Sequence, residues 1–323
     1  MKMVVAAVAL AAGLAALWVE PAQISTALPS PVPEEAWHSL YESGDAELQR
    51  ALERSLNANA QWKSLIKKKK MAVGVVDLSD IEEPRFARVN GSVMMYAASL
   101  PKIAILLAAY QSFEDGSLEE TEEIHADLVA MIRTSNNAAA TRMIDLVGFD
   151  KIEEVLTDPR YDLYDPDRGG GLWVGKRYAK TGKRVGDPVA NISHGATATQ
   201  VCRFYYLLAT GRIISPERSR QMLEDLSDPG LHHKFVSVIE IRAPRARLFR
   251  KSGSWKQWHS DSILVWGENW RHYILVAMVE SEKGETIMRE LVPVVEDLLH
   301  SPVTPTRTPP PETAAGVEPA DLN

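Results

Sequence analysis

The middle of the chain carries hydrophobic patterns of two kinds. Residues 103–110 are continuously apolar, which is typical of a helix buried on all sides, and Pro101 is acceptable in its first turn. Residues 246–250 alternate like a strand, and two further strand candidates follow at 262–267 and 272–280. This part of the chain therefore predicts a domain built from both helices and strands.

The same reasoning extends the domain on both sides. A first strand is predicted at 71–78, preceded by a helical hairpin or one long helix at 46–69. Residues 139–143 predict a helix, and residues 195–200 introduce another that ends near residue 210. An amphipathic helix is predicted from about residue 285 to 300.

Both ends of the chain differ from this middle part. Lys2 and the almost wholly apolar residues 4–19 predict a signal peptide or, if uncleaved, a membrane anchor. The best cleavage site lies at residues 25–27, which places the mature start near Leu28 and the domain in an oxidising space, the periplasm. We expect a leader at 1–27, a linker with a helical segment at 28–70, one domain at 71–300 and a disordered proline-rich tail at 301–323.

Three short motifs follow one another within the predicted domain. The first has the form S-x-x-K, the second S-x-N and the third K-[ST]-G. They are Ser99-Leu100-Pro101-Lys102, Ser135-Asn136-Asn137 and Lys251-Ser252-Gly253. Each form also occurs a second time, at Ser64-Leu65-Ile66-Lys67, Ser55-Leu56-Asn57 and Lys180-Thr181-Gly182, so the surroundings must decide between the copies.

The surroundings favour the first set. Ser99 lies at the N-terminus of the predicted buried helix, whereas Ser64 lies beside four consecutive lysines on what should be a solvated helix end. Lys251 follows a predicted strand, but Lys180 lies in a stretch rich in glycine and charge. A rigid strand is the better support for a catalytic group.

The residue types in the three motifs suit nucleophilic catalysis. Ser99 and Lys102 are three positions apart on one helix face, so the amine reaches the hydroxyl. Burial and the positive end of the helix dipole favour the neutral amine, which then acts as a base. Ser135 is placed to relay a proton toward a leaving group, and the amide of Asn137 to orient Lys102 or to bind a substrate amide.

The third motif predicts the substrate-binding part of the site. The backbone N–H groups of Ser99 and Ser254 are candidates for an oxyanion hole. Lys251 and the hydroxyl of Ser252, next to Gly253, are candidates to hold a substrate carboxylate. Each motif alone also fits a structural role, with Ser99 and Ser135 as helix caps and Lys251 as an exposed strand lysine.

Taken together, the motifs resemble those of class A β-lactamase-related serine hydrolases of the penicillin-recognising superfamily. The resemblance covers residues 71–300. It implies an α+β fold with an antiparallel sheet flanked by helices, packed on an all-helical part, and an active site in the crevice between them. The short span between Ser99 and Ser135 predicts that the helical part is trimmed. The implied mechanism is covalent acylation of Ser99 without metal or cofactor.

The chain departs from the family pattern in two places. The loop at 162–173 lacks the Glu-x-x-x-Asn that activates the deacylating water in class A enzymes, and offers Asp162, Asp165 and Asp167 instead. The acyl-enzyme would then accumulate, or Lys102 and Ser135 would activate water. After Lys251 no substrate-binding arginine is evident, and we expect the negative charge of Asp261 to repel a β-lactam.

These features leave several functions open. One is a β-lactamase-type hydrolase acylated by β-lactams, and another is a hydrolase of cell-wall peptides, esters or amides. A third is a non-catalytic module that uses the cleft to hold a wall fragment or a partner protein. The net charge of −7 gives no support to nucleic-acid binding.

Other tempting residues receive simpler interpretations. His232, His233 and His259 lack metal-ligand spacing, so surface or loop roles are expected. Cys202 is expected in the core. Trp255 and Trp258 are candidates to line a substrate groove.

Overall fold

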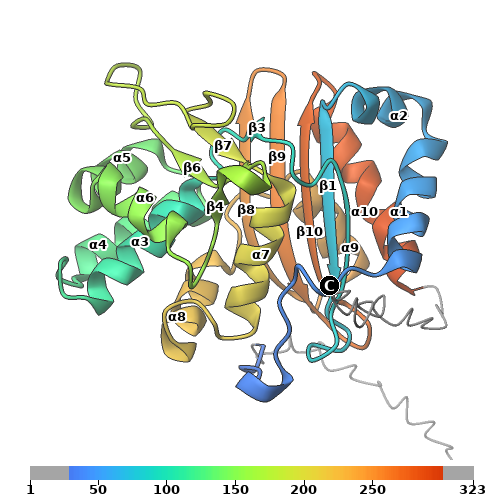
Figure 1. Cartoon of the computed structure of the whole chain (residues 1–323), viewed down its shortest axis with the longest axis horizontal. Helices are drawn as coiled ribbons and strands as arrows, with labels where there is room; N and C mark the ends of the chain where they lie inside the picture. The colour runs from blue at the N-terminus through green and yellow to red at the C-terminus, as the bar shows by residue number, and fades with distance from the viewer. Residues whose placement is uncertain (1–28, 301–323) are drawn as a thin grey trace, which may run out of the picture.

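The computed structural model describes residues 29–300, so the predicted leader and the predicted tail lie outside the described residues. A five-stranded antiparallel sheet in the order β2-β1-β10-β9-β8 forms the centre of the molecule (Figure 1). Its strands are β1 (Met71–Asp77), β2 (Arg85–Val89), β8 (Arg247–Trp255), β9 (Trp258–Trp266) and β10 (His272–Glu280). The predicted strands are present, and β9 begins earlier than predicted because Trp258 to Asp261 pair with the end of β8 in a hairpin.

One face of the sheet is covered by helices from both ends of the described chain (Figure 1). These are α1 (Ala46–Ala58), α2 (Ala60–Lys67), α9 (Phe235–Arg242) and α10 (Gly284–His300). Residues 46–69 form two helices rather than one, because Asn59 ends α1 and its side chain accepts hydrogen bonds from the backbone N–H groups of Gln61 and Trp62. The apolar sides of these helices and of the sheet form one buried cluster.

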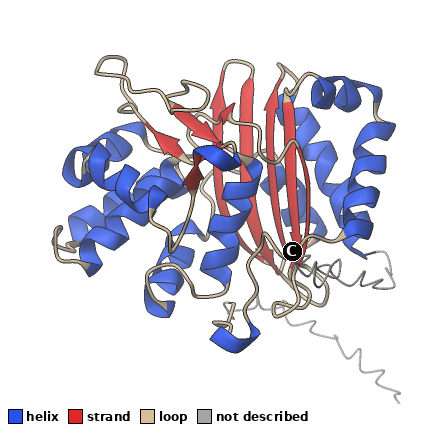
Figure 2. Cartoon of the chain, in the orientation of Figure 1, coloured by secondary structure: helices blue, strands red, loops and turns tan. Residues whose placement is uncertain are grey.

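The other face carries the larger, helical part of the molecule (Figure 2). Its helices are α3 (Lys102–Glu114), α4 (Glu122–Arg133), α5 (Asn137–Val147), α6 (Phe149–Thr157), α7 (Ala198–Ala209) and α8 (Pro216–Leu226). Within α3, Lys102 to Phe113 are all buried, as the continuous apolar run predicts. α7 packs directly on β1 and β10, and Cys202 within it is buried as expected.

Short elements missing from the sequence prediction connect the two parts. They are β3 (Met95–Tyr96), β4 (Tyr164–Asp165), β5 (Gly170–Gly171), β6 (Trp173–Val174), β7 (His194–Ala196) and the 3-10 helices at Glu34–Ala36 and Pro166–Arg168. β3, β7 and β6 form a small sheet that places the segment before Ser99 beside residues 173–196. Two-residue strands carry too little periodicity to be recognised in a sequence.

The architecture confirms the predicted α+β class. Between residues 29 and 300, none of the helices has the length and apolar character needed to cross a membrane. The described part of the chain is thus an antiparallel sheet between two helical layers, with the segment before α3 and the strand β8 meeting at one end of the sheet.

Candidate active site

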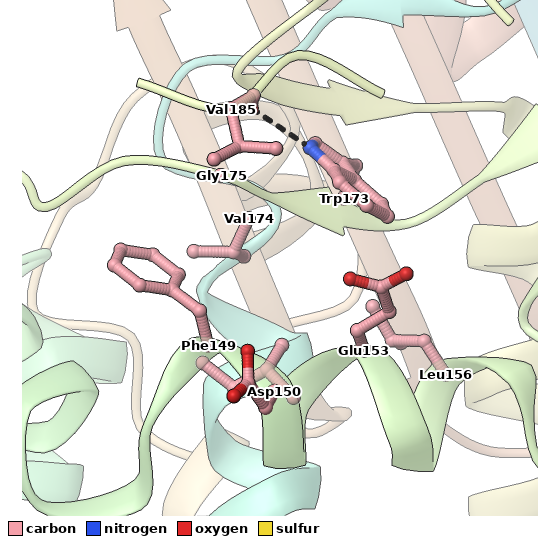
Figure 3. Close-up of a pocket in the computed structure, with 9 residues that line it drawn as sticks. Phe149, Asp150, Glu153, Leu156, Trp173, Val174, Gly175 and Val185 are labelled. Carbon is pink, nitrogen blue, oxygen red and sulfur yellow. Dashed lines mark hydrogen bonds between the residues drawn. The ribbon is translucent and has the colours of Figure 1, made fainter. Parts of the chain in front are cut away.

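A cavity of about 120 Å³ lies between α6, β6 and the loop that follows β6 (Figure 3). Apolar side chains of Phe149, Ile152 and Leu156 line it, and Trp173 Nε1 closes one side by donating to Val185 O at 3.2 Å. None of its lining residues belongs to the three motifs. The candidate site is therefore built from the motif residues themselves rather than from this cavity.

Ser99 lies in a tight turn that leads into α3. Ala98 before it has a left-handed φ of 52°, and Lys102 N donates to Ser99 O at 3.3 Å. The residue that precedes the helix is Pro101, and α3 has no side-chain cap. Ser99 is therefore not a helix cap. Its half-buried side chain makes no hydrogen bond within the described chain, which leaves the hydroxyl available to react.

Lys102 is the first residue of α3 and is completely buried. Its Nζ donates to Ser135 O at 2.7 Å and to Asn137 Oδ1 at 2.8 Å, and lies 3.4 Å from both Ser135 Oγ and Asn136 O. Burial lowers the pKa of Lys102 to about 7, and no carboxylate lies near enough to oppose this shift. Lys102 therefore exists partly as a free amine at neutral pH, three positions along the chain from Ser99.

The residues of the second motif have different structural roles. Ser135 has a left-handed φ of 59°, which turns the chain between α4 and α5 toward Lys102. The cap of α5 is Asn136, whose Oδ1 accepts from Ala138 N and Ala139 N at 2.9 and 3.0 Å. Ser135 is therefore free of a capping role and faces the two motif lysines.

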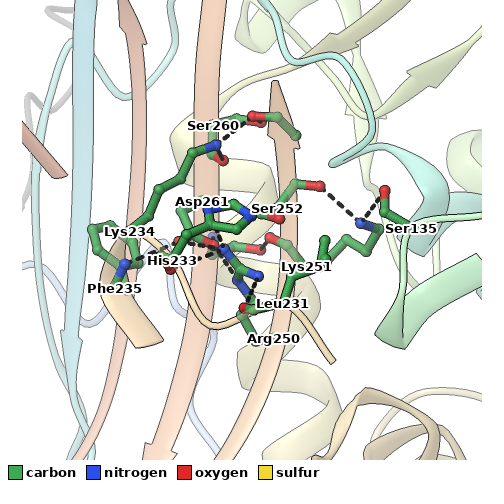
Figure 4. Close-up of polar contacts among 12 residues, drawn as sticks. Ser135, Leu231, His233, Lys234, Phe235, Arg250, Lys251, Ser252, Ser260 and Asp261 are labelled. Carbon is green, nitrogen blue, oxygen red and sulfur yellow. Dashed lines mark hydrogen bonds and ion pairs between the residues drawn. The ribbon is translucent and has the colours of Figure 1, made fainter. Parts of the chain in front are cut away.

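Lys251 extends from β8 to the same hydroxyl (Figure 4). Its Nζ donates to Ser135 Oγ at 3.0 Å and to Ser252 O at 2.7 Å. Burial, together with the charges of Lys102 and Arg250, holds the pKa of Lys251 well below its ordinary value. Lys251 is 1% exposed, so it is not a surface strand lysine.

Gly253 brings the third motif against the first. A Cβ at Gly253 would lie 2.6 Å from Ser99 N, so only glycine allows β8 to approach the Ser99 turn this closely. On the neighbouring strand, Ser260 Oγ donates to Ala97 O at 2.7 Å and fixes the same turn. β8 is an edge strand, so its outer side is not covered by another strand. Ser252 is buried and Ser254 is exposed at this edge.

Lys234 is a buried lysine that the motifs do not reveal. It lies directly before α9 with a φ of 55°, and its Nζ donates to Gly253 O at 2.6 Å, Ser254 Oγ at 2.8 Å and Ser260 O at 2.9 Å. Burial lowers its pKa to about 8. Lys234 thus supplies a buried cation that supports the end of β8 beside Ser254. Its signal in the sequence is weak because it belongs to no motif.

The expectation that Asp261 repels an anionic substrate is wrong. Asp261 is completely buried and accepts from Arg250 Nε at 2.7 Å and from its second nitrogen at 2.9 Å (Figure 4). The backbone N–H of Phe235 also donates to this carboxylate. Arg250 therefore neutralises the charge of Asp261 inside the protein, and Arg250 and Phe235 satisfy its hydrogen bonds.

The acidic residues of the 162–173 loop do not reach Ser99. Asp162 accepts from Tyr41 and lies 3.7 Å from Arg203, and Asp165 pairs with Arg168 at 3.1 Å. Asp167 is exposed. None of these carboxylates contacts a motif residue, so the candidates for a deacylating carboxylate are not at the site.

An aromatic cluster packs against Lys102. The ring centroid of Tyr178 lies 4.6 Å from Lys102 Nζ, and Tyr178 packs against the ring of His194 at 4.3 Å. Trp258 packs edge-on against Tyr96 at 5.6 Å, while Trp255 is 57% exposed at the tip of the β8–β9 hairpin. Trp255 is therefore open to a ligand, and Trp258 is partly engaged.

His232 and His233 lie beside charged residues. His232 Nδ1 lies 2.8 Å from Glu240 Oε1, and His233 lies beside Arg250. Within residues 29–300, no group of three or more His, Cys, Asp or Glu side chains is arranged to hold a metal ion.

Comparison with known proteins agrees with this geometry. The profile of the beta-lactamase enzyme family matches residues 52–129 and 126–295. The chain belongs to this family. The two matched segments include all three motifs, from Ser99 to Gly253. No curated protein sequence matches the chain.

Solved structures share the fold of this β-lactamase family member at low sequence identity. The β-lactamase from Sphaerobacter thermophilus is 18% identical over 73% of this chain and 96% of its own, with a TM-score of 0.56. PBP-A is 15% identical over 84% and 98%, with a TM-score of 0.57. The β-lactamase from Burkholderia phymatum is 14% identical over 76% and 98%, with a TM-score of 0.56. At such identities these likenesses establish the β-lactamase/transpeptidase-like fold.

Proposed function

We propose that this protein is an exported serine hydrolase that is acylated at Ser99 by β-lactams or by a related amide or ester. The observation that carries the proposal is the environment of Lys102. Its amine is buried and has a pKa of about 7. Two oxygens from residues 135–137 hold it in place beside a serine without other hydrogen-bond partners. A positioned free amine is what a serine nucleophile requires as its base.

The proposed reaction begins with attack of Ser99 Oγ on the substrate carbonyl. Lys102 takes the serine proton, and Ser135 passes a proton to the leaving nitrogen as the C–N bond breaks. The oxyanion is held by the backbone N–H groups of Ser99 and Ser254, which the close approach of Gly253 keeps near each other. The product of this step is an ester between Ser99 and the acyl group.

An anionic substrate fits the charge state of the two motif lysines. Lys102 and Lys251 are both near Ser135 Oγ, so protonating both at once is costly. A substrate carboxylate beside Lys251 and Ser252 favours the protonated form of Lys251. The positive charge of that ammonium then disfavours a proton on Lys102. Substrate binding would thereby leave Lys102 ready to act as the base.

Intact-protein mass spectrometry after mixing with a penicillin tests the proposal. We expect a mass increase on Ser99 that is absent in Ser99→Ala and unchanged in the control Ser64→Ala, because Ser64 is an exposed residue of α2. A short-lived adduct with hydrolysed drug in solution identifies a β-lactamase. The absence of an adduct at Ser99 in the unchanged protein would contradict acylation by β-lactams.

A second candidate is a cell-wall peptidase or esterase of the same fold. It is favoured by the lack of a carboxylate beside Lys102, since an enzyme without a strong deacylating base forms a long-lived β-lactam adduct. A variant of the neighbour PBP-A has been determined as an acyl-enzyme complex with penicillin G. A stable adduct, together with turnover of peptidoglycan peptides or esters, would favour this candidate.

Export is proposed from the apolar residues 4–19 alone. Fractionation of cells and N-terminal sequencing of the product test it. We expect a periplasmic protein that begins near Leu28 or, if the leader is retained, a protein in the inner membrane.

A further inference from the structure

Tyr178 packs its ring against the amine of Lys102 and belongs to none of the three motifs. It comes from the loop between β6 and β7, residues 175–193, and its ring centroid lies 4.6 Å from Lys102 Nζ. The hydroxyl of Tyr178 donates to Ala98 O at 3.2 Å, one residue before Ser99. No sequence motif points to this residue.

The ring of Tyr178 is held in place by its neighbours. His194 packs on it at 4.3 Å, and His194 Nε2 donates to Lys176 O at 2.9 Å, which ties the start of the loop to β7. At the base of the loop, Val185 N donates to Gly175 O at 2.7 Å, while Trp173 Nε1 donates to Val185 O (Figure 3). The loop is thus a fixed cover rather than a free segment.

The ring and the second motif together surround the amine of Lys102. Ser135 O and Asn137 Oδ1 accept its N–H groups, and the ring of Tyr178 lies against the same amine. An aromatic face is electron-rich, so it attracts an N–H and disfavours a lone pair. The ring therefore disfavours a lone pair of Lys102 that points at the loop, and it occupies space from which water could reach the amine.

This arrangement suits acylation and opposes hydrolysis. In acylation Lys102 accepts a proton from Ser99. In hydrolysis a water oxygen attacks the ester carbonyl, a base takes the water proton, the bond to Ser99 Oγ breaks, and Ser99 regains a proton as the acid leaves. That water needs a base, and the carboxylates of the 162–173 loop are held elsewhere. Lys102 is the available base, and the ring of Tyr178 covers it.

We propose that Tyr178 is a positioning residue that sets the lifetime of the Ser99 acyl-enzyme, because its ring keeps water from Lys102. The inference rests on the proposed acylation of Ser99. It assigns separate roles to the two ends of the side chain: the ring shields the amine, and the hydroxyl steadies the Ser99 turn through Ala98 O.

The first test separates acylation from deacylation. Tyr178→Ala is expected to shorten the lifetime of the penicillin adduct about a hundredfold, the lower end of what access to a general base provides. Tyr178→Phe keeps the ring, so its adduct should persist as in the unchanged protein. The control Arg177→Ala removes an exposed side chain of the same loop, which pairs with Asp145 of α5, and should leave the lifetime unchanged.

The second test measures shielding of Lys102 without any β-lactam. Cyanate carbamoylates free amines, and peptide mass spectrometry reports the rate at Lys102. We expect slow modification in the unchanged protein and in Tyr178→Phe, and modification at least about tenfold faster in Tyr178→Ala, as for a base opened to solvent. Tyr178→Ser serves as a second opening variant if Tyr178→Ala does not fold.

The outcomes distinguish the inference from the proposed function. If the unchanged protein forms no adduct at Ser99, the proposed function fails, and the cyanate rates still decide whether the ring shields Lys102. If adduct lifetime or cyanate modification is the same with and without the ring, the inference is overturned. It is also overturned if Tyr178→Phe behaves like Tyr178→Ala, because the hydroxyl and not the ring would then matter.

Discussion

Lys251 on the edge strand β8 donates a hydrogen bond of 3.0 Å to Ser135 Oγ at the end of α4. This bond joins the sheet to the helical part across the site. Lys102 approaches the same hydroxyl from α3 to 3.4 Å, so one serine lies between two buried amines. The protonation of the two lysines is therefore coupled through this point.

Removing the shared hydroxyl tests its role as a proton relay. We expect Ser135→Ala to lower the rate of Ser99 acylation about a hundredfold, the scale of a lost proton-transfer group. Lys102 keeps its bonds to Ser135 O and Asn137 Oδ1, so folding should be preserved. Thr134→Ala is the matched control, because Thr134 donates to Ala130 O within α4. Equal acylation rates for both variants would exclude a relay through Ser135.

The lowered pKa of Lys102 predicts the direction of the pH dependence. With a pKa of about 7, Lys102 is an ammonium below that pH and a free amine above it. Acylation should therefore rise about tenfold from pH 6 to pH 8 and then level off, as expected for a general base. Stopped-flow measurement of adduct formation gives the profile. A rate that falls over this range would contradict Lys102 as the base.

Lys234 is expected to contribute to both stability and substrate binding. Lys234→Met leaves Gly253 O and Ser260 O without their strongest donor, which should lower the free energy of unfolding by about 2 kcal/mol. The loss of the bond to Ser254 Oγ should also slow acylation at low penicillin concentration. Urea unfolding and acylation rates measure the two effects. The control Lys63→Met changes an exposed lysine of α2, and an equal effect there would refute a special role for Lys234.

The buried pair of Arg250 and Asp261 gives a prediction opposite to the one from sequence. Asp261→Asn should lower the free energy of unfolding by about 3 kcal/mol, because Arg250 is left buried without its counter-charge. It should not accelerate acylation by penicillin, since the charge of Asp261 is already neutralised by Arg250. Glu268→Gln breaks an exposed pair with Arg245 and should change stability by less than about 0.5 kcal/mol. Faster acylation in Asp261→Asn would restore the idea of repulsion.

For the first and third motifs, the local pattern separated a buried copy from an exposed one. Ser64 and Lys180 are exposed in the structure, and Lys102 and Lys251 are buried. The sequence distinguishes the copies because a continuous apolar run or an alternating strand is buried when the chain folds. The polar residue next to such a segment is then buried with it. The family and the α+β class follow from the same local signals.

The sequence by itself determined the buried helix α3, the strands β1, β8, β9 and β10 of the main sheet, and the three motifs. Each of these features depends on hydrophobic periodicity within about ten residues, which can be recognised from the sequence. Only the tertiary structure decided that Asp261 faces Arg250, that Lys234 supports β8, and that Tyr178 covers Lys102. These contacts join residues from separate elements, and their partners depend on how the elements pack. Packing also sets the pKa of Lys102, because burial is a property of the folded molecule and not of the residue.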